Sequence, residues 1–388
     1  MVSGKKGWEE VNLPSILNRN GMNIIDPKVN FSSIVSIGED VQKLESETGL
    51  EYLKLHRGVM DVTQIDLGSI KIDINSKKIQ QYSPNDGNPK LIELIRSEYG
   101  FTKDHKIIIT PGGMSSLDLV ISSLSDSKFW IPKYHWGSWN KILKIYNKDI
   151  QLFDEFDISN FRPESGVVMM CFPSNPTGWM PGGSDLIGFL DHCFSNNITV
   201  ILDLPYYFLF NSSDNIGLSK KFSDNVIVTS SFSKDIGLSG FRIGYISTKS
   251  DQLWKSLRVR SLYKYNSINN LSQEIIVSLF STLDGRSSIR NFRDKTVSHI
   301  SQNISWLSRE GLLYCEYPSD PVGPFAVVNL SYDFLMGYKI SSVPLNKFTT
   351  VNSSNQFSRI SVSVDHQIFL KYMSQIKLSQ TPKHTHIV

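Results

Sequence analysis

Apolar and polar positions follow two rhythms along most of the chain. From about residue 65 onward, short apolar runs rich in Val and Ile alternate with longer segments whose apolar residues recur every three or four positions. The short runs have the length and composition of buried β-strands, and the longer ones are typical of amphipathic helices. The pattern predicts seven strands, at 106–110, 128–131, 150–153, 166–171, 199–202, 226–229 and 242–247.

Helical periodicity fills the intervals between these strands. Strands that alternate with helices are typical of proteins in which helices cover both faces of a mostly parallel sheet. The predicted fold class is therefore α/β, with a three-layer large domain. The helices expected around this sheet lie at 89–99, 114–124, 136–146 and 185–194.

The pattern changes after residue 250, where helical periodicity dominates and is followed by a mixture of short strands and helix. We interpret the chain as a large domain at 65–307 and a smaller α+β domain at 308–388, which the weakly periodic segment 1–64 joins. The elements predicted in this second half are helices at 251–264, 271–283, 287–307 and 367–376, and strands at 325–330 and 359–364.

Composition excludes several classes of function. The formal charge of +3, from 40 basic and 37 acidic residues, gives no bias toward nucleic acid or membranes. No apolar run approaches the roughly 18 residues of a membrane-spanning helix. The three cysteines, Cys171, Cys193 and Cys315, lack metal-ligand spacing and are interpreted as reduced thiols. We therefore expect a cytoplasmic protein without a metal site.

The strongest chemical candidate is Lys234, which follows the predicted strand 226–229 in a segment rich in Ser and Gly. A lysine amine condenses with an aldehyde to form a Schiff base when its pKa is lowered enough for the free base to exist. The nearby Ser231, Ser233 and Arg242 suit a phosphate dianion. An aldehyde and a phosphate on one small molecule describe pyridoxal 5′-phosphate (PLP).

Residues suited to this cofactor follow other predicted strands as well. Gly112 and Gly113 allow close approach of the backbone to a phosphate, and the next helix begins there. Tyr134 follows the strand 128–131 and can stack on a pyridine ring. Taken alone, each feature is equally consistent with a tight turn or a core aromatic residue.

Three further strand-end residues complete the series. Asn175 precedes a proline, which holds it in an extended or turn conformation, and its amide can donate to a phenolate oxygen. Asp203 ends a buried strand without a basic neighbour in sequence, and a protonated pyridine nitrogen would pair with it. Tyr206 can donate to the same phenolate oxygen. A plain turn and a helix cap remain the structural alternatives, but the series as a whole favours a PLP site.

With these residues in place, the chain resembles the fold-type I PLP-dependent enzymes, and among them the class I and II aminotransferases related to aspartate aminotransferase. The resemblance extends from about residue 65 to residue 376. The motifs that carry it are Tyr82 in Tyr-Ser-Pro-Asn-Asp-Gly, the turn Gly112-Gly113-Met114, Tyr134, Ser-Asn175-Pro-Thr-Gly, Asp203 with Tyr206, Ser-x-Ser-Lys234 with Arg242, and Arg359.

The resemblance implies a role for each of these positions. Lys234 would form the Schiff base and then move a proton, and Asp203 would pair the ring nitrogen. Tyr82 would reach the phosphate of the other subunit, which implies a homodimer with shared active sites. The remaining roles implied are stacking by Tyr134, contact with the 3′-oxygen by Tyr206 and Asn175, phosphate binding by Gly112, Gly113, Met114, Ser231, Ser233 and Arg242, and substrate binding by Arg359, Asn175 and Gly68.

The chain departs from the family pattern in ways that concern the substrate. Gly68 lacks the Glu-Pro that usually follows, and Leu204-Pro205 replaces an acidic residue. The resemblance implies transfer of the amino group of an L-α-amino acid to a 2-oxo acid. The alternatives are a lyase, cyclase or oxidase on the same fold, and a PLP-binding regulator, for which residues 1–64 show no basic recognition helix.

Overall fold

A computed structural model describes residues 26–210, 221–351 and 355–376. Its main feature is a seven-stranded sheet with the strand order β2-β8-β7-β6-β5-β3-β4. All neighbouring pairs are parallel except those of β8, which runs antiparallel to both β2 and β7. The strands are β2 (Lys106–Thr110), β3 (Lys128–Pro132), β4 (Asp149–Phe153), β5 (Val167–Cys171), β6 (Thr199–Asp203), β7 (Val226–Ser231) and β8 (Gly244–Thr248).

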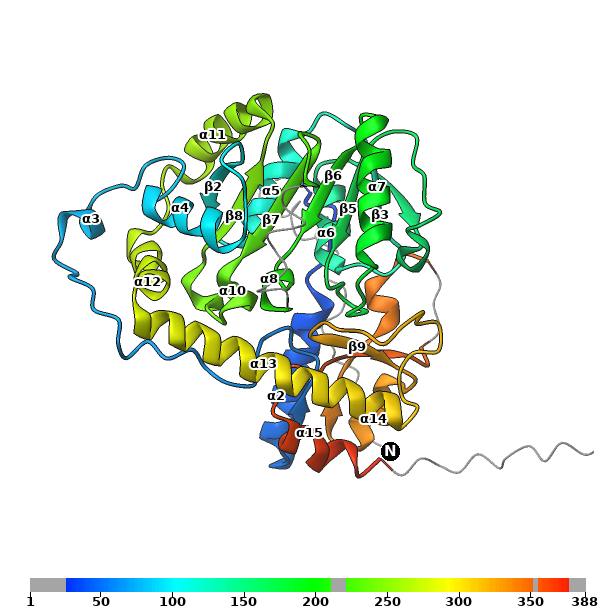
Figure 1. Cartoon of the computed structure of the whole chain (residues 1–388). Coiled ribbons are helices and arrows are strands. Elements are labelled where there is room, and N and C mark those ends of the chain that lie inside the picture. Colours follow the sequence, from blue (N-terminus) through cyan, green and yellow to red (C-terminus); the bar gives the residue numbers. More distant parts are fainter. Residues whose placement is uncertain (1–25, 211–220, 352–354, 377–388) are drawn as a thin grey trace, which may run out of the picture.

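Helices cover both faces of this sheet (Figure 1). Alternation along β5 sends Val168 and Met170 into one core cluster and Val167 and Met169 into the other. The first cluster includes residues of α4, α7 and α12, and the second includes residues of α5, α6 and α11. The predicted α/β fold class, with its mostly parallel sheet between two helical layers, is confirmed.

The helices around the sheet begin and end close to their predicted positions. They are α4 (Pro89–Glu98), α5 (Gly113–Ser123), α6 (Gly137–Ile145), α7 (Gly183–Ser195), α11 (Asp251–Tyr265) and α12 (Asn270–Ser281). Shorter helical turns lie at α3 (Lys77–Gln80), η1 (Glu155–Asp157), α8 (Tyr207–Phe210), α10 (Phe232–Asp235) and η3 (Ser239–Phe241).

A single long helix, α13 (Leu283–Arg309), connects the sheet to the smaller part of the molecule (Figure 1). Its buried residues recur every three or four positions, as an amphipathic helix requires. Ile289 and Phe292 pack into the two clusters beside the sheet, whereas Ile300, Ile304 and Leu307 belong to a third. The helix therefore stabilises both parts of the fold.

The third cluster lies in the smaller part, which contains a three-stranded antiparallel sheet of order β11-β12-β9. A separate parallel pair joins β1 to β10, so that Leu53 lies opposite Ile340. The division of the chain into domains stays a prediction, and its ends at 1–25 and 377–388 lie outside the described residues. The elements here are α2 (Ser33–Thr48), β1 (Leu53–Lys54), β9 (Phe325–Val328), α14 (Tyr332–Gly337), β10 (Ile340–Ser341), β11 (Val343–Pro344), η4 (Leu345–Phe348), β12 (Ser358–Ser361) and α15 (His366–Met373).

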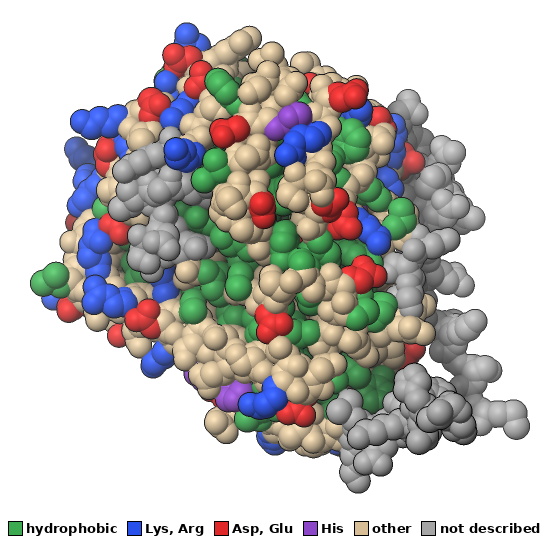
Figure 2. All heavy atoms as spheres, turned by 45° about the vertical axis from the view of Figure 1, so that its right-hand side comes forward, with side chains coloured by type: hydrophobic (Ala, Val, Ile, Leu, Met, Phe, Trp, Pro, Cys, Tyr) green, Lys and Arg blue, Asp and Glu red, His purple; other side chains and the backbone are tan. Residues whose placement is uncertain are grey.

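The surface combines charged and apolar regions. Figure 2 shows one face on which hydrophobic side chains gather near the centre and charged side chains lie mostly around them. Within the described ranges, no helix is long and apolar enough to cross a membrane, and no group of three or more His, Cys, Asp or Glu side chains is arranged to hold a metal ion. Cys171 and Cys193 are buried and Cys315 is exposed, and none forms a disulfide.

Candidate active site

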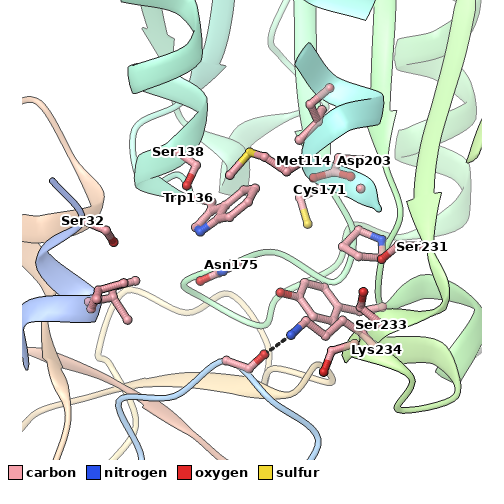
Figure 3. A pocket seen from close by; sticks show the side chains of 18 of the residues that line it. Ser32, Met114, Trp136, Ser138, Cys171, Asn175, Asp203, Ser231, Ser233 and Lys234 are labelled. Carbon is pink, nitrogen blue, oxygen red and sulfur yellow. Dashed lines mark hydrogen bonds between the residues drawn. The ribbon is translucent and has the colours of Figure 1, made fainter. Parts of the chain in front are cut away.

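A cavity of about 380 Å³, here called the central cavity, lies where the parallel strands end (Figure 3). Cys171 ends β5, Asp203 ends β6 and Ser231 ends β7, and all three line it. This edge is where open α/β sheets place ligands, because the strands end there and the following loops diverge. The N-terminal segment and the small antiparallel sheet close the cavity through Gly58 and Arg359.

Lys234 lies in the short helix α10, directly after β7, and its side chain enters the central cavity. Its Nζ donates a hydrogen bond to the backbone oxygen of Gly58. Burial lowers the pKa of Lys234 to about 8, and the positive charges of Arg242 and Arg359 act in the same direction. The amine is therefore roughly one-tenth free base at pH 7, far more than an ordinary lysine, which favours Schiff-base chemistry.

Asp203 is 5% exposed and lies at the inner end of the central cavity (Figure 3). Its Oδ1 accepts a hydrogen bond of 3.0 Å from Thr229 Oγ1. Burial raises the pKa of Asp203 to about 7, against the effect of that hydrogen bond. No described residue forms an ion pair with this carboxylate, so a cationic N–H group in the cavity would stabilise its charged form.

Tyr206 and Asn175 lie next to each other in the central cavity. Burial raises the pKa of Tyr206, and the Asn175 amide beside the phenol opposes the rise. The amide oxygen of Asn175 is buried and has no hydrogen-bond partner among the described residues. Both side chains are thus available to a polar ligand that enters between them and Asp203.

The other end of the cavity suits a phosphate. Gly112 has a φ of 90°, and a Cβ there would come within 2.4 Å of Arg242 Nη2. Only glycine therefore permits this close contact between the turn and the guanidinium. Helix α5 begins at Gly113, and the hydroxyls of Ser231 and Ser233 line the same region, together with Met114. Backbone N–H groups, hydroxyls and a cation are the groups that bind a phosphate dianion.

Arg359 is 1% exposed and reaches the central cavity from β12. Its Nη2 donates to the backbone oxygen of His56, whereas its Nε has no hydrogen-bond partner among the described residues. The guanidinium lies 4.4 Å from the ring centroid of Phe325 and 5.2 Å from that of Phe348. Burial lowers the pKa of Arg359 to about 10. A buried guanidinium without a described acidic partner is well suited to bind a carboxylate.

Four predicted site residues do not line the central cavity, and one of them, Gly112, lies beside it against Arg242. Tyr134 packs against Tyr314 instead, with its hydroxyl 3.3 Å from that of Tyr314. Gly68 is exposed on a loop, where its N–H donates to Asp66. Tyr82 is 81% exposed on the surface. Stacking by Tyr134 and substrate contact by Gly68 therefore have no support from this geometry within one chain.

Other residues occupy the places where these were expected. Trp136, two positions after Tyr134, is the aromatic side chain that lines the cavity from that strand end. Gly58, rather than Gly68, is the glycine of the segment before residue 70 that lines the cavity. The strand-end rule located the segment but gave no information on which aromatic ring turns inward. Ser32 and Ile34 also line the cavity, and no sequence motif marks the segment before residue 65 that carries them.

A buried charge cluster fixes the loop that carries Lys234. Asp235 receives two hydrogen bonds from Arg293 of α13, of 2.9 Å to Oδ1 and 2.6 Å to Oδ2. The hydroxyl of Tyr99 also donates to Oδ2. A Cβ at Gly237 would come within 2.7 Å of the Phe292 ring, so the loop lies directly on the helix. The paired, buried charges hold the lysine loop against α13.

Comparison with known proteins shows the family to which the chain belongs. The profile of the family "Aminotransferase class I and II" matches residues 65–363, which is most of the chain. The chain belongs to the class I and II aminotransferase family. The matched region contains every residue of the site described above except those of the N-terminal segment.

Curated relatives match shorter stretches. A histidinol-phosphate aminotransferase of Oceanobacillus iheyensis is 34% identical over 133 residues, which are 33% of this chain and 36% of the relative. A probable aspartate aminotransferase of Methanocaldococcus jannaschii is 29% identical over 198 residues, 45% of this chain and 51% of the relative. The matches thus span about a third to a half of these aminotransferases.

Solved structures of the family match nearly the whole fold. The aspartate aminotransferase of Thermus thermophilus with maleate has a TM-score of 0.75, with 16% identity over 91% of this chain and 99% of that chain. An aminotransferase from Mycobacterium tuberculosis has a TM-score of 0.75 and 17% identity over 92% and 98% of the two chains. At this level of identity the likeness concerns the fold.

Proposed function

We propose that this protein is a PLP-dependent aminotransferase that transfers the amino group of an L-α-amino acid to a 2-oxo acid. The observation that carries the proposal is the buried Lys234, whose lowered pKa leaves it reactive between an acidic and a phosphate-binding end of one cavity. The family membership agrees with this chemistry. The proposed activity is that of a transferase in amino-acid metabolism, and we further expect a biosynthetic role and a cytoplasmic location.

The residues present fit PLP at each of its polar groups. Asp203 is a buried carboxylate that lacks a described cationic partner, as a ring-nitrogen site requires. Arg242, which packs against Gly112, lines the cavity together with the hydroxyls of Ser231 and Ser233, and these groups would bind the phosphate. Asn175 and Tyr206 would hold the 3′-oxygen between these ends. When bound, the cofactor supplies an electron sink for charge that develops at the substrate α-carbon.

The chain's own side chains would perform the proton transfers. The Lys234 amine would hold the cofactor until the substrate amine displaces it, and the free amine would then take the proton from the α-carbon. Tyr206 and Asn175 would orient the phenolic side of the site. Arg359 would fix the substrate α-carboxylate, with Asn175 beside it, so that the α-hydrogen faces Lys234.

A panel of amino acids tests the reaction type. The holoenzyme is mixed with each amino acid, first without and then with a 2-oxo acid, and the visible absorbance of the cofactor and the products are followed. A transaminase gives a single half-turnover without the acceptor and continuous turnover with it. Product formation that needs no acceptor would instead identify a lyase, cyclase or oxidase, and binding without turnover would identify a regulator.

Substitution of Arg359 by lysine is expected to raise KM for amino acids by roughly ten- to a hundredfold. The reason is that a guanidinium binds a carboxylate through two parallel hydrogen bonds, and loss of a charge-assisted bond costs about 1.5–3 kcal/mol. PLP content should stay unchanged, because the proposed cofactor contacts lie on other elements. The measurement is KM and kcat with bound PLP quantified in the same preparation. An unchanged KM would remove Arg359 from the substrate site.

A homodimer with shared sites is also proposed, on the basis of the family resemblance. Tyr82 is 81% exposed and does not line the central cavity of its own chain, and it would reach the phosphate site of a second subunit. Leu271 is exposed beside it, in the same surface hollow. Sedimentation of the holoenzyme with parallel activity assays tests the idea, since a fully active monomer would contradict it.

A further inference from the structure

A second cavity, of about 290 Å³, lies beside the central cavity and is here called the basic cavity. Four residues line both cavities, so the two share a wall: Ser32, Ile34, Trp136 and Ser138. Figure 3 shows Ser32 and Ser138 across the central cavity from Lys234. The basic cavity therefore adjoins the part of the central cavity that lies away from Lys234, where the side chain of the substrate would lie.

Four lysines line the basic cavity, and no acidic residue does: Lys28, Lys141, Lys144 and Lys347. Lys28 Nζ donates to Asn147 Oδ1 at 2.8 Å and Lys141 Nζ donates to the backbone oxygen of Phe31 at 2.9 Å. None of the four forms an ion pair with any residue that the structure describes. Four positive charges around one hollow repel each other, so an anion between them would be stabilised.

The backbone adds to this positive field. Helix α6 begins at Gly137, and its N-cap residue Trp136 makes no side-chain capping bond. The first N–H groups of the helix and its positive dipole end therefore face the region of Gly137 and Ser138, which both line the basic cavity. His135 adds no charge near neutral pH, because burial lowers its pKa.

The three cations of the central cavity are already assigned. Lys234 would carry the cofactor, Arg242 would bind its phosphate and Arg359 would bind the substrate α-carboxylate. The side-chain end of the substrate is left with Ile34, Trp136 and the two serines, which contact an uncharged stem well but cannot neutralise a charge. Beyond this wall lie the four lysines.

We propose that the basic cavity binds an anionic group at the far end of the substrate's side chain. The inference rests on the proposed aminotransferase function, and it names the substrate class: an α-amino acid whose uncharged stem passes Ile34 and Trp136 and ends in a phosphate ester or a carboxylate. Lysine amines are compact donors that bind either anion as point charges.

Selectivity for charged substrates tests the proposal. kcat/KM is measured for O-phospho-L-serine, L-2-aminoadipate and the uncharged L-norleucine with the wild-type holoenzyme and with Lys144→Gln/Lys347→Gln. The wild type should prefer at least one anionic substrate over norleucine, and the double variant should lower that ratio by roughly tenfold or more, through KM. The phosphate and carboxylate substrates distinguish the two kinds of anion. Lys255→Gln is the matched control, because Lys255 is exposed on α11 and lines neither cavity.

A binding measurement separates failure of this proposal from failure of the proposed function. Inorganic phosphate is titrated into each holoenzyme by calorimetry, where the cofactor already fills its own phosphate site. We expect one weak phosphate site in the wild type and in Lys255→Gln, with affinity lowered roughly tenfold or more in the double variant. Equal phosphate affinity in all three proteins, or an unchanged preference among the substrates, would overturn the subsite. If the wild-type holoenzyme binds phosphate but turns over none of the substrates, the proposed aminotransferase function is wrong and the anion subsite stands.

Discussion

Lys234→Ala is expected to abolish covalent attachment of PLP and to lower turnover by several orders of magnitude. The cavity holds the Lys234 amine, buried and with its pKa lowered to about 8, at the point where the proposed cofactor and substrate sites meet. An alanine can neither bond the cofactor nor carry a proton from the substrate. Borohydride reduction of the loaded protein followed by peptide mapping locates the modified residue. A label on any lysine other than Lys234 would contradict the assignment.

The pH dependence of cofactor capture provides a control that reports on the same amine. Only the free base condenses with an aldehyde, and the free-base fraction of Lys234 rises as pH increases through about 8. The rate of PLP capture by the wild-type apoprotein should therefore rise through that region and level off above it. With a lysine of ordinary pKa, the rate of capture would keep rising to about pH 10. In Lys234→Ala, non-covalent PLP binding should persist, because the proposed phosphate and ring contacts remain.

The parts of the fold with strong local signals were predictable. The strand at Val226–Ser231 and the helix at Pro89–Glu98 lie within two residues of their predicted bounds. The apolar residues of each element recur regularly along its length, and these same residues pack in the core beside the sheet. The strand-end rule then brought Asp203, Asn175 and Lys234 to one edge, since the ends of parallel strands meet there.

The N-terminal segment shows why the rest was not predictable. Helix α2 (Ser33–Thr48) buries only Val41 fully, and it belongs to a segment that carries no motif of the cofactor site. Gly58 follows strand β1, which pairs with β10. The two strands lie more than 280 positions apart in the sequence, so no local pattern predicts this pairing. No local pattern distinguishes Gly58 from Gly68, and the choice between Trp136 and Tyr134 depends on a contact with Tyr314. These features arise from long-range packing.

Asp203→Ala is expected to lower turnover by several orders of magnitude while the protein still binds PLP. The carboxylate would keep a proton on the ring nitrogen, and without that charge the ring is a poor electron sink. Asp203 is the only acidic side chain among the described residues that line the cavity, so none there replaces the lost charge. Asp203→Glu should retain more activity, because it keeps the charge while displacing it. Steady-state kinetics with bound PLP quantified measures both effects.

The stability of the apoprotein tests the same carboxylate independently of activity. Burial raises the pKa of Asp203 to about 7 from an ordinary value of 3.8, so between these pH values the folded state holds a proton that the unfolded state releases. The free energy of unfolding should therefore fall as pH rises from about 4 to 7. Glu155, whose pKa burial raises to about 7, contributes in the same direction, so the comparison must be made against Asp203→Ala. The variant should show a shallower pH dependence than the wild type. Equal slopes together with near-normal turnover would mean that Asp203 is a structural residue and that another group pairs the ring nitrogen.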